Sequence, residues 1–153
     1  MTSHASYTDL RVGGVVITPY RRRCHAPIPF YASRIPAGFP SPATDYLDDG
    51  LDINDLVIRH PAATFFVRVE GESMIGAGIH PGDTLVVDRA ERPTDRAVVV
   101  AILNGAFTVK RMCRREGQIV LTSENEQMPP IQLSAEMDFE VWGVVTYVIH
   151  QVQ

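Results

Sequence analysis

From residue 62 onward, apolar residues come in short runs that are separated by turn residues. The runs cover residues 64–70, 83–88, 97–103, 106–112, 118–123 and 139–149. Runs of this length that are rich in Val, Ile, Thr and Phe and bounded by Gly, Pro, Asn or Asp are typical of β-strands. Asn104-Gly105, between the third and fourth runs, predicts a tight hairpin because both residues tolerate a positive φ angle. We therefore predict a mostly β fold, with a compact antiparallel β-domain over residues 62–153.

Residues 1–61 show a different pattern, without sustained periodicity and with frequent Gly and Pro. We expect an extended N-terminal arm over residues 1–37 and an extended linker over residues 38–61, in which Pro40 and Pro42 favour extended backbone. The end of the linker, ahead of Pro61, is compatible with a short helix or a turn. Gly and Pro interrupt every window in which the two helices of a helix-turn-helix would lie. Direct sequence-specific DNA binding is therefore not expected.

Composition and charge narrow the class of protein. The 153 residues suffice for one domain with appendages. No apolar run approaches the length of a membrane-spanning helix and the first residues lack a signal-peptide pattern, so we expect a cytoplasmic protein that makes no membrane contact. The net charge is −4, although residues 1–37 hold five arginines and one acidic residue. We interpret the three arginines at 21–23 as part of a solvated arm rather than a nucleic-acid patch, because the acidic body repels phosphate.

Two residues of the β-domain are candidates for chemistry. Lys110 is the only lysine beside thirteen arginines, and it lies in the run at 106–112. A desolvated lysine can lose its proton and act as a base, which an arginine cannot. Ser73 lies in the Gly-rich turn GESMIGAG, where the backbone can present the hydroxyl outward. A Ser-Lys dyad is one reading, but alternation along the strand would also allow an ordinary turn serine and an exposed, solvated lysine.

Three separate motifs support the catalytic reading by resemblance. GESMIGAGIHPGDTLVVDR, then FTVKRM thirty-seven residues after Ser73, then FEVWGVVTYVI are similar to the LexA/UmuD-like family of self-cleaving serine peptidases. The similarity extends over residues 35–149. It implies a LexA/UmuD C-terminal-like β-domain in which Ser73 is the nucleophile and Lys110 the general base. It also implies that the backbone N–H groups of Ser73 and Met74 hold the oxyanion, that Ala37-Gly38 is the bond cut, and that neither a metal nor an organic cofactor takes part.

The segments AGFPSPATDY and LDINDLVIRHPAATFFV resemble most the branch of this family that serves error-prone translesion DNA synthesis. For that branch, the resemblance implies self-cleavage that a RecA filament on single-stranded DNA stimulates in the SOS response to DNA damage. It further implies a trimmed homodimer that joins a UmuC-like Y-family DNA polymerase. The first thirty-three residues match no motif of the family.

Three alternatives stay open from the sequence. A LexA-type repressor would use the same chemistry, but the missing helix-turn-helix argues against it. A signal peptidase shares the Ser-Lys dyad but would need a membrane anchor. A non-catalytic scaffold that only binds a polymerase would keep the β-domain with Ser73 and Lys110 inactive. Cys24 and Cys113 have no metal-binding spacing, and we interpret both as free thiols.

Overall fold

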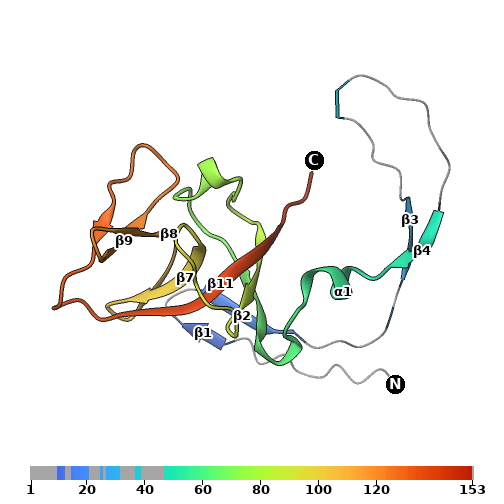
Figure 1. Cartoon of the computed structure of the whole chain (residues 1–153), viewed down its shortest axis with the longest axis horizontal. Helices are drawn as coiled ribbons and strands as arrows, with labels where there is room; N and C mark the ends of the chain where they lie inside the picture. Colours follow the sequence, from blue (N-terminus) through green and yellow to red (C-terminus); the bar gives the residue numbers. More distant parts are fainter. Residues whose placement is uncertain are drawn as a thin grey trace. The chain divides into compact units, whose positions relative to one another are not determined.

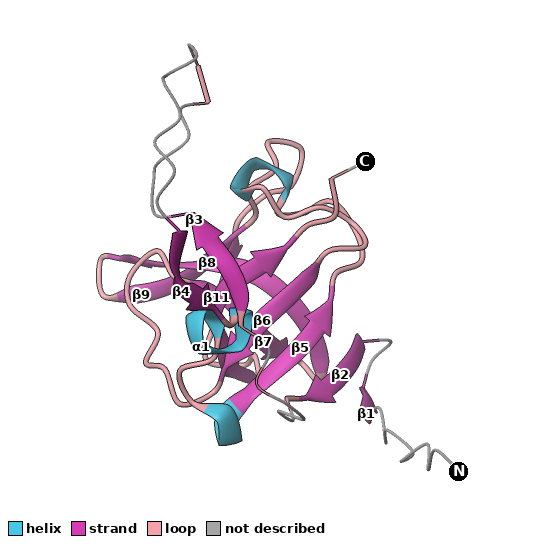
Figure 2. Cartoon of the chain, turned by 90° about the vertical axis from the view of Figure 1, so that its right-hand side faces the viewer, coloured by secondary structure: helices cyan, strands magenta, loops and turns pink. Residues whose placement is uncertain are grey.

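The computed structural model describes residues 10–12, 15–20, 25, 27–31, 37–38 and 47–152. Its contacts divide the chain into two units. One unit consists of Met1–Tyr20 with His60–Gln153, and the other is Arg21–Arg59. The regular structure of the first unit is mostly strand, with two short 3-10 helices at Pro61–Ala63 and Ile75–Ala77 (Figure 2). The predicted mostly β, antiparallel fold is thereby confirmed.

The first unit holds a nine-stranded antiparallel sheet. The strand order is β1-β2-β5-β6-β11-β7-β8-β9-β10 (Figure 1). The strands are β1 (Leu10–Val12), β2 (Val15–Pro19), β5 (Thr64–Arg68), β6 (Thr84–Asp88), β7 (Val98–Leu103), β8 (Ala106–Arg115), β9 (Gln118–Thr122), β10 (Ile131–Gln132) and β11 (Phe139–Ile149). Each of the six predicted runs coincides with one strand, namely β5 to β9 and β11.

The turns follow from residues that adopt positive φ angles. Asn104 and Gly105 have φ angles of 49° and 80° and join β7 to β8, as the hairpin prediction requires. Glu116 and Gly117 repeat this conformation at 50° and 80° between β8 and β9. The positive φ angles at both central positions are those of a tight hairpin turn, whose twist matches that of the flanking strands. These two hairpins place β8, the strand that carries Lys110, between β7 and β9.

Strand β11 lies between β6 and β7 and therefore joins the two halves of the sheet (Figure 1). Its register shifts between Val141 and Gly143 against β7, and between Val145 and Tyr147 against β6. A Cβ atom at Gly143 would lie 2.6 Å from Val87 Cγ1. Only glycine fits here, because the neighbouring strand β6 approaches β11 closely at this bulge.

Two apolar clusters form the core, and β7 contributes to both. Val100 belongs to the first cluster, together with Val67, Met74 and Leu85. Its neighbour Val99 belongs to the second cluster, which also holds Ala101, Met112 and Leu121. The alternation of side chains along a strand explains this division, since successive residues point to opposite faces.

The segment predicted as an arm contributes two strands to the sheet. β2 pairs with β5, with Ile17 opposite Val67, and β1 pairs with β2. Ile17 is 3% exposed and belongs to the first core cluster. Contacts therefore divide the chain after Tyr20 and after Arg59, whereas the predicted boundary at residue 37 refers to a covalent cut.

The second unit contains β3 (Ile28–Tyr31), β4 (Leu47–Leu51) and α1 (Ile53–Val57). β3 and β4 form an antiparallel pair. Asp52 caps α1 by accepting a hydrogen bond of 2.9 Å from the backbone N–H of Asn54. This is the short helix that was one of the two options for the end of the linker. Among the described residues, no helix has the length and apolar character that crossing a membrane requires.

Candidate active site

Ser73 lies in the loop between β5 and β6. Backbone hydrogen bonds close the base of this loop, from the N–H of Val69 to the oxygen of Asp83 and from the N–H of Gly82 to the oxygen of Val69. The side chain of Met74 is 2% exposed and packs in the first core cluster. The loop is therefore anchored at its base and by the residue that follows Ser73, which leaves Ser73 half-buried at a defined place.

A second segment, residues 123–125, holds the loop from the other side. The N–H of Glu124 donates to the oxygen of Ser73 at 2.8 Å, and the N–H of Gly76 donates to the oxygen of Glu124 at 2.7 Å. The amide of Asn125 donates to the oxygen of Glu72 at 3.0 Å. A Cβ atom at Gly76 would lie 2.7 Å from the oxygen of Glu124, so a side chain at this position would push the two segments apart.

The fold brings Ser73 next to β8. The hydroxyl of Ser73 donates to the backbone oxygen of Val109 at 3.5 Å, and Val109 directly precedes Lys110. This distance is at the outer limit of a hydrogen bond, so the hydroxyl is loosely held and can turn toward another acceptor. A hollow of about 210 Å³ beside the hydroxyl is lined by residues of β5, the loop, β7 and β8, among them Met74, Val100 and Phe107.

Lys110 is buried in the middle of β8, with 9% of its surface exposed. It is paired with Val99 of β7, and no hydrogen bond or ion pair of its amine involves any residue that the structure describes. Burial lowers the pKa of Lys110 from its ordinary value, because desolvation penalises the charged form. Met112, on the same face of the strand, is buried as well. The alternative of a solvated, exposed lysine therefore does not describe this residue.

The backbone around Ser73 offers donors for a negatively charged oxygen. Within the described part of the chain, the N–H groups of Ser73 and Met74 have no hydrogen-bond acceptor, whereas those of Ile75, Gly76 and Ala77 are all paired. A backbone N–H group without a protein partner is available to donate to water or to a bound group. These two are the donors that the resemblance implies for the oxyanion.

Ala37 and Gly38 lie in the second unit. Both residues are exposed and form a bend. A Cβ atom at Gly38 would meet no atom within 4 Å. The predicted bond is thus accessible and uncrowded, which a peptide bond must be if a nucleophile is to reach its carbonyl carbon.

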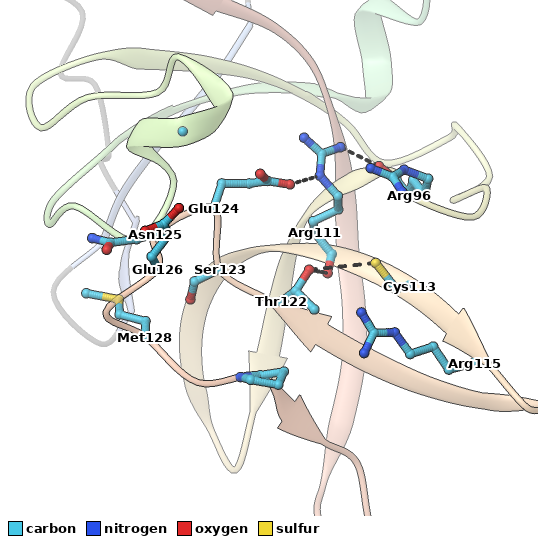
Figure 3. A pocket seen from close by; sticks show the side chains of 12 residues that line it. Arg96, Arg111, Cys113, Arg115, Thr122, Ser123, Glu124, Asn125, Glu126 and Met128 are labelled. Atoms are coloured by element: carbon cyan, nitrogen blue, oxygen red, sulfur yellow. Dashed lines mark hydrogen bonds and ion pairs between the residues drawn. The ribbon is translucent and has the colours of Figure 1, made fainter.

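Sequence reasoning missed Glu124 and Arg111. Glu124 holds the Ser73 loop through its backbone, and its carboxylate forms an ion pair with Arg111 of β8. Arg111 also donates to the oxygen of Arg96 at 2.6 Å (Figure 3). Arg111 directly follows Lys110, so this chain of contacts connects the serine loop to the lysine strand. The segment 123–127 has no periodicity, and nothing in its residues indicates this role.

Figure 3 shows these residues in an open pocket of about 500 Å³. Neither Ser73 nor Lys110 lines it. Cys113 faces Thr122 in this pocket, with 3.6 Å between Sγ and Oγ1. Neither Ser73 nor Lys110 belongs to any of the three groups of His and carboxylate side chains in the described part of the chain that could hold a metal ion.

The chain belongs to the S24-like peptidase family, whose model matches residues 29–146. This match covers both units and includes Ser73, Lys110 and the Ala37-Gly38 bond. The predicted family is thereby confirmed, and with it peptidase activity as the property of the family.

Individual relatives agree with this membership. Protein SamA of Salmonella typhimurium is 42% identical over 137 residues, which cover 90% of this chain and 95% of SamA. Protein ImpA of Escherichia coli is 46% identical over 123 residues, covering 80% of this chain and 83% of ImpA. A LexA repressor of Psychromonas ingrahamii is 35% identical over 117 residues, covering 76% of this chain but only 56% of the repressor. The chain therefore matches UmuD-like proteins over most of their length, and the repressor over about half.

Proposed function

We propose that this protein is a serine peptidase that cuts its own Ala37-Gly38 bond with a Ser73-Lys110 dyad. The trimmed protein then serves, as a homodimer, as a subunit of an error-prone translesion polymerase of the UmuC-like Y family. A RecA filament on single-stranded DNA stimulates the cut after DNA damage. The proposal goes beyond family membership, because it names the residues that act and the partners that bind.

The chemistry assigned to the site requires no cofactor. Lys110, neutral at the moment of attack, takes the proton of the Ser73 hydroxyl while Oγ bonds to the carbonyl carbon of Ala37. The negative charge that develops on the carbonyl oxygen is stabilised by the N–H groups of Ser73 and Met74. The C–N bond then breaks, and Lys110 returns the proton to the nitrogen of Gly38. Water, deprotonated by Lys110, hydrolyses the ester and restores Ser73.

One observation supports this proposal most. A serine hydroxyl contacts the backbone of the residue that directly precedes a buried lysine, although thirty-seven positions separate the two in the sequence. Burial lowers the pKa of Lys110, which raises the fraction of neutral amine available at a given pH. The loosely held hydroxyl and the unpaired N–H groups beside it complete the set of groups that acyl transfer needs.

The proposed substrate is part of the same chain, so the Ser73-Lys110 dyad can be a slow catalyst and still cut the bond. A tethered bond has a high effective concentration at the nucleophile, so a single turnover can proceed with a slow catalyst. Gly38 also leaves the bond without a side chain on its leaving side. A second copy of the chain would serve equally as substrate within a homodimer.

The test is intact mass spectrometry of purified full-length protein after incubation at about pH 10, a pH near which even an unperturbed lysine loses its proton. We expect a fragment that begins at Gly38 in wild type, none in Ser73→Ala, and almost none in Lys110→Arg. The arginine keeps the positive charge but cannot act as a base. A parallel sample at neutral pH with RecA on single-stranded DNA tests the proposed stimulation.

Two results would overturn the assignment. Cutting of the Ser73→Ala variant at the same bond would remove Ser73 from the mechanism. Wild-type protein that stays intact at pH 10 and also with RecA filaments would favour the non-catalytic scaffold instead. A repressor is the less favoured second candidate, since the chain matches only about half of the LexA relative. Specific binding of a DNA duplex in a mobility-shift assay would revive it.

A further inference from the structure

Two histidines and one aspartate form a cluster that the proposed peptidase chemistry does not use. Asp83 ends the loop that carries Ser73, His80 lies three residues before it, and His150 directly follows β11. The Nδ1 atom of His150 lies 2.6 Å from Oδ1 of Asp83. The Nδ1 atom of His80 lies 3.8 Å from Oδ2 of the same carboxylate. Both imidazoles therefore turn the same ring nitrogen toward one carboxylate.

The fold prepares this arrangement. His80 and Asp83 are the ends of a turn that is closed by a hydrogen bond from the N–H of Asp83 to the oxygen of His80, with Gly82 at a φ angle of +90°. The N–H of His80 donates to Oδ2 of Asp83 at 2.8 Å and fixes the carboxylate. Thr84 pairs with Ile149, so Asp83 and His150 are the next neighbours along the same pair of strands.

The electrostatics favour a cation. Asp83 is 4% exposed, whereas the side chains of the two histidines are about half exposed. The buried carboxylate lies beneath two imidazoles that solvent can reach.

The distances suit a small tetrahedral ion. Ligand atoms about 2.0 Å from a zinc ion at tetrahedral angles are about 3.3 Å apart. The two imidazole-carboxylate distances here, 2.6 Å from His150 to Oδ1 and 3.8 Å from His80 to Oδ2 of Asp83, are one shorter and one longer than this separation. All three candidate ligand atoms lie within 4.8 Å of one another. Small rotations of two half-exposed rings would equalise the distances without moving the backbone.

We propose that His80, Asp83 and His150 form a binding site for one divalent transition-metal ion, with Zn²⁺ as the occupant and water in the fourth position. Imidazole ligands favour Zn²⁺ over Mg²⁺ and Ca²⁺, which prefer oxygen. With the metal on Nδ1 of each imidazole, the proton of the neutral ring lies on Nε2. The ion joins the end of the Ser73 loop to the end of β11.

Two other clusters in the described part of the chain serve as internal comparisons. His60 contacts Asp88 near Glu91, and His25 contacts Asp52 near Asp55. Each of these clusters has a single imidazole. Asp88 accepts hydrogen bonds from the backbone N–H groups of Ala90 and Glu91 through Oδ1, just as Asp83 accepts one from His80 through Oδ2. The cluster around Asp83 differs from both in having a second imidazole. It therefore offers Zn²⁺ one more nitrogen ligand than either of the other clusters does.

The experiment uses full-length, tag-free protein that has been treated with a chelator and kept in a non-thiol reductant. Zn²⁺ is titrated by calorimetry, and Co²⁺ replaces it for absorption spectroscopy. We expect one Zn²⁺ per chain and a Tm that rises by about 5 °C or more when free Zn²⁺ is a hundredfold above its Kd. The Co²⁺ complex should show tetrahedral d–d bands without the charge-transfer band that a cysteine ligand would add.

Variants identify the ligands. His80→Gln and His150→Gln should each weaken Zn²⁺ binding by at least about tenfold, while the matched controls His60→Gln and His25→Gln keep the wild-type affinity. All four histidines are at least partly exposed, so these changes leave the core intact. Absence of saturable binding, or binding that His80→Gln and His150→Gln leave unchanged, would overturn the proposal. None of these measurements depends on self-cleavage, so their outcome is independent of whether the proposed peptidase function is correct.

Discussion

At the scale of single residues, Lys110 is the only lysine or arginine that is buried in the part of the chain that the structure describes. It is buried on β8, which lies between β7 and β9, and desolvation lowers the pKa of its amine. An arginine at this position would carry its charge into the same surroundings at any pH, because its pKa is far above the range that proteins meet. A buried lysine can instead be neutral, and this is the property that a general base for Ser73 requires.

This lowered pKa predicts how stability depends on pH. Between the folded-state pKa of Lys110 and about 10.4, the ordinary value, the unfolded chain binds the proton more tightly, so the free energy of unfolding rises with pH in this window. Below the window, the full cost of burying the charge is present. Lys110→Met should therefore be more stable than wild type at neutral pH, and this advantage should shrink as the pH rises toward 10.

Urea unfolding at several pH values measures this difference. Arg115→Met is the matched control, because Arg115 lies on the same strand, is exposed, and keeps its charge over the whole range. The difference between this control and wild type should stay constant with pH. A pH-independent difference for Lys110→Met would show that the buried amine does not titrate between neutral pH and 10.

At the scale of elements, the loop after β5 and the segment at 123–125 act as one unit. Neither is a regular helix or strand over its length, and their mutual hydrogen bonds replace those that a strand partner would supply. Gly76 allows this contact because its Cα lies against the oxygen of Glu124. The position of the Ser73 hydroxyl therefore depends on a residue three positions away that has no side chain.

Gly76→Ala should disturb this unit. The new Cβ would meet backbone atoms of Glu124, which cannot rotate away, so we expect a loss of about 1–3 kcal/mol in the free energy of unfolding. We also expect faster hydrogen exchange at the amide of Glu124, which donates to Ser73, and slower self-cleavage.

Gly78→Ala provides the control for this prediction. Gly78 has a φ angle of +75°, so alanine is strained there, but its Cβ would meet no atom within 4 Å. This variant should lose some stability and keep the slow exchange at Glu124. Equal exchange at Glu124 in both variants would show that the contact with Gly76 does not hold the loop.

At the scale of the whole molecule, the segment before the proposed cut is part of the main sheet. Ile17 of β2 is buried in the first core cluster, and β2 pairs with β5 over three residue pairs. Cutting Ala37-Gly38 would break one covalent bond and leave these contacts in place. Release of the N-terminal fragment would then be a separate event that exposes the edge of β5.

We therefore expect the cut fragment, residues 1–37, to remain with the body during size-exclusion chromatography in native buffer. Ile17→Asp should speed its separation, because burying a carboxylate without a partner is costly. Ile28→Asp makes the same change at a position of the same fragment that is 66% exposed, and it should leave the separation unchanged. Immediate loss of the wild-type fragment after cutting would show that β2 does not retain it.

The local pattern of residues predicted six of the seven strands of the β-domain, all except the two-residue β10, and one of its hairpins. Strand formation depends on short runs of β-branched and aromatic residues, and Asn104-Gly105 needs no distant partner to adopt its φ angles. Ser73 and Lys110 could be named as candidates because their residue types, with the family motifs around them, point to one chemistry.

Only the tertiary structure decided how these parts meet. That Lys110 is buried, that Ser73 contacts the residue before it, and that Glu124 holds the serine loop are consequences of pairing between segments far apart in the chain. The same holds for β2. Its short apolar run beside Gly and Pro indicates an arm in the sequence, but pairing with the edge of β5 makes it a strand of the sheet. Local sequence determines which backbone conformations are favourable, whereas burial and long-range pairing depend on what the rest of the chain places alongside.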